Sequence, residues 1–279
     1  RKESSAASDV YKRQRFDRAP FTVNQKFSCG EVRLVYRLAY RKTKNKEEIY
    51  TRLPFTFNVV FWAVDQAGKG TNCFNIAKYW KKYPEFVKNL DKFKYQFNHR
   101  YLKSVEVNFQ AVRWPSSVRP DFGGYAEYLM RVFKPLGTEK GFKPALMENM
   151  IDVSKLKARP HLKKELLKYL KNKKNIKSFD HGIGTVPDKF LAEKAISAAF
   201  HGLARLKNRP FDQLFNSTDF KEVDFSGGEF VKTSQAYLRR LNDLSCVGCH
   251  QGRAIAGFHF VGVDRAETHG ANSVKMARS

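Results

Sequence analysis

Five consecutive residues near the carboxyl end of the 279-residue sequence carry its clearest chemistry: Cys246-Val247-Gly248-Cys249-His250. Two thiols at this spacing can each form a thioether bond with a vinyl-derived carbon of a porphyrin, on neighbouring pyrrole rings. The next residue, His250, can then give an imidazole nitrogen to the iron. The spacing therefore predicts one covalently attached haem c, held by Cys246 and Cys249 with His250 as an iron ligand.

Two other kinds of site also use closely spaced cysteines. A structural zinc site needs four ligands, usually from a second Cys/His pair with close spacing, and the sequence has no such pair. A thioredoxin-like dithiol opens a helix after a strand in a βαβ unit. The residues before Cys246 predict a helix instead, so we favour haem attachment.

Residues 235–262 resemble the haem-attachment region of c-type cytochromes, in which the motif commonly follows the end of a helix. The predicted helix from Val231 to Leu244 runs directly into Cys246 and agrees with this context. The resemblance implies thioether links at Cys246 and Cys249 and a proximal ligand at His250. Arg253 is a candidate partner for a haem propionate, because a guanidinium matches a carboxylate in a forked geometry. The alternative for Arg253 is an ordinary surface arginine.

The second axial ligand of the iron would decide the chemistry. Methionine suits electron transfer, a second histidine lowers the potential, and an open position admits peroxide or gaseous ligands. His259 is the first candidate, because it lies in an apolar, glycine-bracketed stretch within reach of a haem edge. Its alternative is an ordinary core histidine. The remaining candidates are His201, His181, His269, Met276 and His99, whereas we interpret Met130, Met147 and Met150 as packing residues.

The charge balance is strongly basic, with 52 Lys and Arg against 27 Asp and Glu and a formal net charge of +25. Such a surface favours anionic partners, although a solvated exterior is the simplest interpretation. No zinc-finger spacing or RNP-like aromatic strand appears, so we expect no specific nucleic-acid binding. An acidic redox partner protein is the expected use of the charge, and contact with an anionic surface is a further candidate. The densest lysine cluster is Lys163, Lys164, Lys168, Lys171, Lys173 and Lys174.

Cys29 and Cys73 remain outside the motif, and either a disulfide or two buried free thiols would account for them. Haem c attachment and disulfides both belong outside the cytoplasm, so we expect a periplasmic or exported protein. The sequence has no run of about 18 apolar residues, so it predicts no transmembrane helix. The chain begins at Arg1 rather than Met, and we expect the export signal to lie outside it.

The first residues have a different origin in our interpretation. Residues 9–14, Asp-Val-Tyr-Lys-Arg-Gln, resemble one reading frame of a widely used transposon sequencing adaptor. We therefore treat residues 1–14 as a non-native segment and leave them out of the fold prediction. Amplifying the gene from source DNA tests this, because the same codons found there would contradict it.

Residues 15–137 predict a mixed region built on an antiparallel sheet of about four strands. Apolar and charged residues alternate over 31–41, and 53–64 is β-branched and aromatic, which predicts a hairpin with a charged loop at 42–48. Further strands are expected at 101–114 and 125–133. Thr71 or Asn72 could cap a helix, and a short second helix is expected at 85–93.

Residues 138–279 predict a mainly helical region that carries the haem site, so the fold class is α+β. Helices are expected at 154–172, where Pro160 begins the main helix, and at 187–201 and 231–244. The favoured function is periplasmic electron transfer. The alternatives are a haem peroxidase-like enzyme with an open distal side, and a non-haem basic module that binds anionic surface polymer or lipid.

Overall fold

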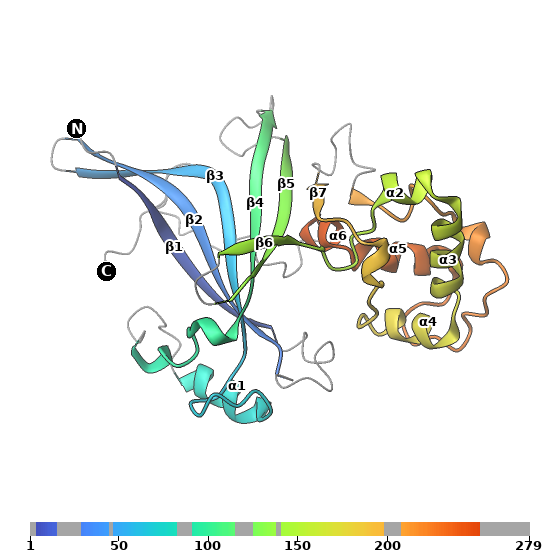
Figure 1. Cartoon of the computed structure of the whole chain (residues 1–279), viewed down its shortest axis with the longest axis horizontal. Helices are drawn as coiled ribbons and strands as arrows, with labels where there is room; N and C mark the ends of the chain where they lie inside the picture. Colours follow the sequence, from blue (N-terminus) through green and yellow to red (C-terminus); the bar gives the residue numbers. More distant parts are fainter. Residues whose placement is uncertain are drawn as a thin grey trace.

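An antiparallel sheet with long strands forms one part of the chain, and a group of short helices forms the other (Figure 1). The computed structural model describes residues 4–15, 29–44, 47–82, 91–114, 125–137, 141–197 and 208–251. Within them the fold is α+β, as the sequence predicts. None of the described helices is long and apolar enough to cross a membrane.

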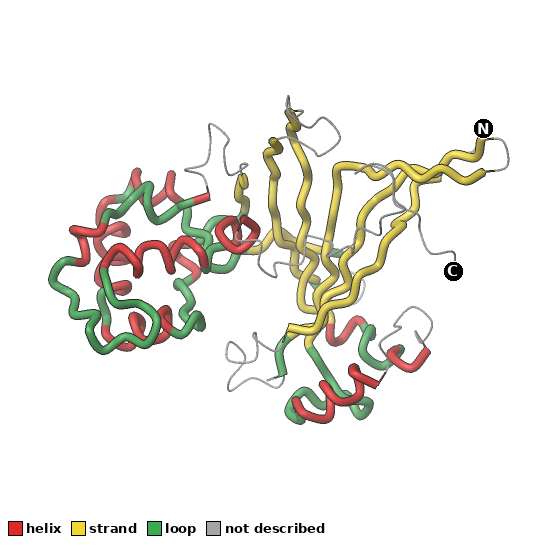
Figure 2. The backbone as a smooth tube through the Cα atoms, turned by 180° about the vertical axis from the view of Figure 1, so that it is seen from behind, coloured by secondary structure: helices red, strands yellow, loops and turns green. Residues whose placement is uncertain are grey.

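Six strands follow one another across the sheet in chain order, each antiparallel to its neighbour. They are β1 (Ser4–Arg15), β2 (Glu31–Lys44), β3 (Glu47–Trp62), β4 (Leu102–Trp114), β5 (Tyr125–Pro135) and β6 (Phe142–Ala145). A seventh described strand, β7 (Lys194–Ser197), pairs with β5 beside β6. The predicted strands at 31–41, 53–64, 101–114 and 125–133 are confirmed, and Figure 2 shows the sheet strands in yellow from the other side of the molecule.

The loop predicted at 42–48 is wrong, because the hairpin continues into it. Lys42 pairs with Ile49, and the ladder ends with Lys44 opposite Glu47. The backbone ladder therefore runs through the charged residues to the turn. Charged residues alone therefore do not mark the end of these strands.

β1 (Ser4–Arg15) lies almost wholly within residues 1–14, which the fold prediction left out, and it pairs with β2. A long stretch of chain with alternating side chains can add to the free edge of a sheet whatever its genetic origin. The non-native origin of residues 1–14 stays a prediction, to be tested on the gene.

A first hydrophobic core, here called the sheet cluster, lies where β2 and β3 meet α1 (Cys73–Lys82) and η3 (His99–Tyr101). Its buried members include Val32, Phe61, Ile76 and Phe93. The two open alternatives for Cys29 and Cys73 are resolved, because they form a disulfide. The predicted cap is also present, since the Asn72 side chain accepts a hydrogen bond from the Asn75 main-chain N–H at 3.1 Å.

The helix expected at 85–93 lies mostly outside the described residues, of which 91–93 form a 3-10 turn. The change to helical structure comes after β6. The elements there are α2 (Val153–Ala158), α3 (Pro160–Leu170), α4 (Lys173–Asp180), η5 (Asp188–Phe190), η7 (Ser217–Phe220), α5 (Ser234–Asp243) and α6 (Cys246–Gln251). Pro160 is the first residue of α3, as predicted.

A second hydrophobic core, here called the helical cluster, gathers side chains from α2 to α5 and the turns between them. Leu156, Leu166, Phe220, Tyr237 and Leu241 are all fully buried in it. The apolar face of each short helix therefore points inward, as expected where packing rather than propensity stabilises helices.

The helix predicted at 187–201 is wrong. The chain forms the single 3-10 turn η5 and then the strand β7, and residues 198–207 lie outside the described part. Burial alternates along β7 with Ala195 buried and Ile196 exposed, and its main chain pairs with β5. The apolar residues of this segment, among them Ala195 and Ile196, fit both the helical period of about 3.6 residues and the strand period of two. Because β6 and β7 join the sheet, a mainly helical carboxyl-terminal half is not confirmed.

Candidate functional site

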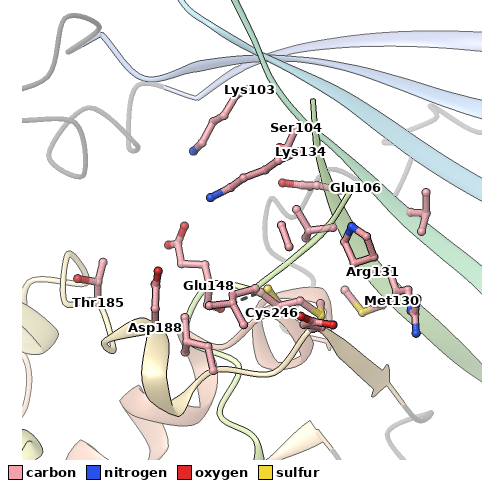
Figure 3. A pocket seen from close by; sticks show the side chains of 18 of the residues that line it. Lys103, Ser104, Glu106, Met130, Arg131, Lys134, Glu148, Thr185, Asp188 and Cys246 are labelled. Atoms are coloured by element: carbon pink, nitrogen blue, oxygen red, sulfur yellow. Dashed lines mark hydrogen bonds between the residues drawn. The ribbon is translucent and has the colours of Figure 1, made fainter. Parts of the chain in front are cut away.

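A cavity of about 950 Å³ lies between the sheet and the helical part of the chain (Figure 3). The sheet contributes Arg33, Glu106 and Met130 to its wall, and the opposite side contributes Met147, Glu148 and Cys246. Sites for small molecules and cofactors usually have volumes of about 300–1,000 Å³. The first cysteine of the motif therefore borders a cavity of cofactor size.

Cys246 begins α6, and its half-buried thiol is not part of a disulfide. Its Sγ donates a hydrogen bond to the main-chain oxygen of Glu148, at 3.2 Å. The preceding residue, Ser245, caps the helix, because its Oγ accepts from the Gly248 N–H at 3.1 Å and donates to the Asn242 oxygen at 2.6 Å. This cap fixes the direction in which α6 leaves α5.

Gly248 is required by the close approach of α6 to the end of α5. A Cβ atom at this position would lie 1.9 Å from the main-chain oxygen of Asn242. Asn242 in turn accepts from the Phe211 N–H and donates to Asp212 and to the Leu238 oxygen. The glycine inside the motif thus has a packing reason of its own.

Val247 anchors α6 from the other direction. It is fully buried among Met130, Met147, Met150 and two alanines, and Cys246 packs against the same group. Positions i, i+3 and i+4 share one face of an α-helix, so positions 246, 249 and 250 of the motif share a face of α6. The side chains of Cys249 and His250 lie outside the described part of the structure.

The other predicted site residues divide into two groups. Arg253, His259, His201, His269 and Met276 lie outside the described residues. His99 and His181 are described, exposed and not among the residues that line the cavity. His181 lies beside Glu229, at 3.7 Å between Nδ1 and Oε2, and against the ring of Phe230.

Two thioethers that sequence reasoning assigned to packing also line the cavity. Met130 comes from β5 and Met147 from the turn after β6, and both are almost fully buried. Three of the four methionines in the chain gather in the cluster that holds Val247. No local pattern indicates this, because only the fold brings strand, turn and motif together.

The sheet wall of the cavity carries a buried ion network. Arg33 bonds to Glu31 at 2.9 Å and to Glu106 at 2.7 Å, and Lys103 also pairs with Glu31. Burial acts to lower the pKa of Arg33, but the charges of Glu106 and Glu31 outweigh it and raise that pKa. The guanidinium is therefore held charged.

The position of Arg33 corrects one feature of the strand prediction. Its alternation with Val32 and Leu34 predicted a half-buried strand, with the arginines on the polar side, yet Arg33 is only 9% exposed. Asn58, also fully buried, donates to Glu106 at 3.2 Å, while its own Oδ1 has no hydrogen-bond partner among the described residues. The polar side of this sheet thus faces the cavity rather than solvent.

Within the described residues no group of three or more His, Cys, Asp or Glu side chains could hold a metal ion. The second cysteine and the histidine of the motif are not part of that set. No family model, curated protein or solved structure matches this chain. Its function is therefore inferred from its own residues.

Proposed function

We propose that this protein is a c-type haem protein that transfers electrons outside the cytoplasm. The observation that carries the proposal is the position of the Cys246 thiol at the wall of a cofactor-sized cavity, at the start of a helix that bears the whole motif. The spacing of the motif alone would fit an exposed loop. Its place beside a cavity supplies the volume that a porphyrin needs.

The residues at the site fit the group chemically. Two thiols can each add S–H across a vinyl double bond, so that a C–S bond forms and no atom leaves, and an imidazole can bind the iron. When bound, haem supplies reversible one-electron transfer. The chain supplies the anchors at Cys246 and Cys249 and the ligand at His250. Val247 holds α6 in place by packing into a buried cluster.

His259 stays a predicted sixth ligand. Met130 and Met147 join it as candidates, because they are thioethers that line the cavity. Methionine ligation raises the potential of a haem and suits an electron carrier, whereas a second histidine lowers it. A haem with Met130 or Met147 as sixth ligand is therefore expected to have a higher reduction potential than a haem with His259.

The remaining predictions on partner and location follow from charge and disulfide. The Cys29–Cys73 disulfide supports a periplasmic or exported location, because disulfides persist there. Exposed lysines on α3 and α4 supply a surface for an acidic redox partner or for an anionic surface. They include Lys164, Lys168, Lys173, Lys174 and Lys177.

The deciding experiment is a pyridine haemochrome spectrum on protein exported together with the c-type maturation machinery. Haem that stays with the polypeptide after denaturation and acid–acetone extraction, with a c-type spectrum, is the expected result. Replacing Cys246 and Cys249 by serine should abolish the retained haem, whereas replacing Cys29 and Cys73 should not. Colourless wild-type protein, or pigment that extracts away, would end the proposal.

The native spectrum of the same sample separates electron carrier from enzyme. A six-coordinate, low-spin haem that is inert to peroxide fits electron transfer. A five-coordinate, high-spin haem that turns over peroxide would replace the carrier with a peroxidase-like activity.

A further inference from the structure

Two lysines face each other directly across the last pair of strands. Lys134 of β5 and Lys143 of β6 are cross-strand partners, and both side chains are exposed and line the cavity. Like charges placed directly opposite in an antiparallel pair destabilise it. Neither lysine has an acidic partner among the described residues, so the pair leaves positive charge at the cavity.

A third lysine adds to the same wall. Lys103 of β4 lines the cavity beside the pair, where its Nζ lies 4.5 Å from the ring centroid of Trp62 and pairs with Glu31. In Figure 3, Lys103 and Lys134 extend into the cavity from the sheet side. The carboxylates on this wall, Glu31 and Glu106, are already paired with Arg33.

The opposite wall has the opposite sign. Glu148 and Asp188 lie there with Cys246, and Figure 3 shows them approaching the cavity from the side away from the lysines. A bound molecule therefore meets a thiol and carboxylates at one side, and at the other side the ammonium groups of Lys134 and Lys143, which have no acidic partner among the described residues. Such a field orients an anionic group toward the sheet.

We propose that Lys134 and Lys143 bind the carboxylate side chains of the cofactor, while Cys246 holds a different edge of it. This inference rests on the proposed function. In haem the propionates and the vinyl-derived carbons lie on different edges of the ring, so a ring fixed at Cys246 can extend its carboxylates across the cavity to β5 and β6. The ammonium groups then donate charge-assisted hydrogen bonds to them. Arg253 lies outside the described residues and stays a predicted propionate partner beside this lysine pair.

Haemin and its dimethyl ester test the inference, because esterification turns the two carboxylates into neutral methyl esters and leaves the ring and the iron unchanged. Non-covalent binding of each is measured by absorbance titration on protein in which Cys246 and Cys249 are serine. We expect Lys134→Gln or Lys143→Gln alone to weaken haemin binding about threefold, and both together about tenfold, because the lysines are exposed to solvent. Binding of the ester should not change.

The matched control replaces two exposed lysines that are not at the cavity, Lys164→Gln and Lys168→Gln on α3. It removes the same charge and should leave both affinities unchanged. Equal weakening of haemin and ester in the β5–β6 variant, or no weakening of either, would overturn the inference. Equal weakening by the control would show a general charge effect and overturn it as well.

Covalent haem in the wild-type protein is measured separately, which keeps the two proposals apart. If wild-type protein carries covalent haem but the lysine substitutions do not change the affinity for haemin, the inference fails and the proposed function stands. If wild-type protein carries no covalent haem, the proposed function fails. Lysine-dependent binding of haemin would in that case still support a carboxylate site, for a ligand held without covalent bonds.

Discussion

Around the sheet cluster a disulfide joins Cys29 to Cys73, whereas the ties of the helical cluster are hydrogen bonds from buried polar side chains to main-chain groups. The disulfide closes a loop whose ends are 44 residues apart in the sequence. In the helical part, Asp180 accepts from the main-chain N–H groups of Glu229, Phe230 and Val231 at 2.6, 2.9 and 2.6 Å. Reductant is thus expected to act on the sheet cluster, and protonation of Asp180 on the helical cluster.

The same chemistry recurs within the helical cluster. Asn149 donates to the Gly184 oxygen and accepts from the Val186 N–H, and the buried Tyr237 hydroxyl donates to the Leu170 oxygen at 2.9 Å. These bonds satisfy main-chain groups in a part of the chain where much of the structure is turn. Short helices and turns leave many such groups unpaired, so buried polar side chains stabilise them.

The largest effect is expected from Asp180→Ala. The change leaves three main-chain N–H groups without their acceptor and should lower the free energy of unfolding by about 4 kcal/mol. Urea unfolding followed by far-ultraviolet circular dichroism measures it. Asp224→Ala is the control, because Asp224 lies at an exposed turn and accepts from the N–H and the side chain of one residue, Ser226, and it should lower stability by less than about 1 kcal/mol. Equal losses of stability in the two variants would show that the three hydrogen bonds to Asp180 stabilise the fold no more than those to Asp224.

Reduction of the disulfide should affect the other region. Replacing Cys29 and Cys73 by serine is expected to lower stability by about 3 kcal/mol, because the unfolded chain regains the freedom of a long loop. All three tryptophans, Trp62, Trp80 and Trp114, belong to the sheet half, so their fluorescence reports on that half. In haem-free protein the fluorescence transition should move to lower urea. A shift caused equally by Asp180→Ala would mean that the two regions unfold as one.

Gly248→Ala tests the corner between α5 and α6. The added Cβ overlaps the Asn242 oxygen, so the main chain must shift, and we expect a loss of about 2 kcal/mol. Because the corner sets the direction of α6, the yield of covalent haem should also fall. Gly227→Ala is the control, since a Cβ there meets no described atom within 4 Å. Full haem content in G248A would contradict this role of the glycine.

The smallest expected difference concerns pH. Burial acts to raise the pKa of Asp180, but hydrogen bonds from Glu229, Val231 and Phe230, together with the charge of His181, outweigh it and lower that pKa. Its contribution to stability is therefore present above the unfolded-state pKa of about 3.9 and is lost as pH falls through the lower folded-state value. Unfolding measured at pH 6 and pH 3 should show a smaller acid loss in Asp180→Asn than in wild type. An identical loss would assign the acid sensitivity to other groups.

Sequence reasoning found the features that depend on neighbours in the chain. The hairpin of β2 and β3 follows from alternation and from β-branched residues, and α3 begins at Pro160 because proline fits a first helical turn. The helix predicted at 187–201 was wrong because Ala195 and Ile196 fit two periods, and pairing with β5 decided between them.

The site could be predicted only in part, because sequence reasoning finds features that depend on neighbours in the chain. The motif is local, so Cys246 can be proposed as a site residue from the sequence, whereas the cavity needs strands and turns that lie far apart in the sequence. Lys134 and Lys143 lie directly opposite each other because of the register between β5 and β6, and composition does not reveal strand register. Arg33 was misplaced because alternation says which residues share a face, and not which face the fold covers.

One edge of β5 is divided between two partners. Val132 pairs with Ala145 of β6, and the adjacent Arg131 pairs with Lys194 of β7. The chain thus leaves the sheet for α2 to α4 and returns at neighbouring positions. Two regions of a chain usually hinge against each other, but here both walls of the cavity are held to one strand by main-chain hydrogen bonds. A redox group in that cavity would therefore change its charge between two walls that cannot separate without breaking strand pairs on β5.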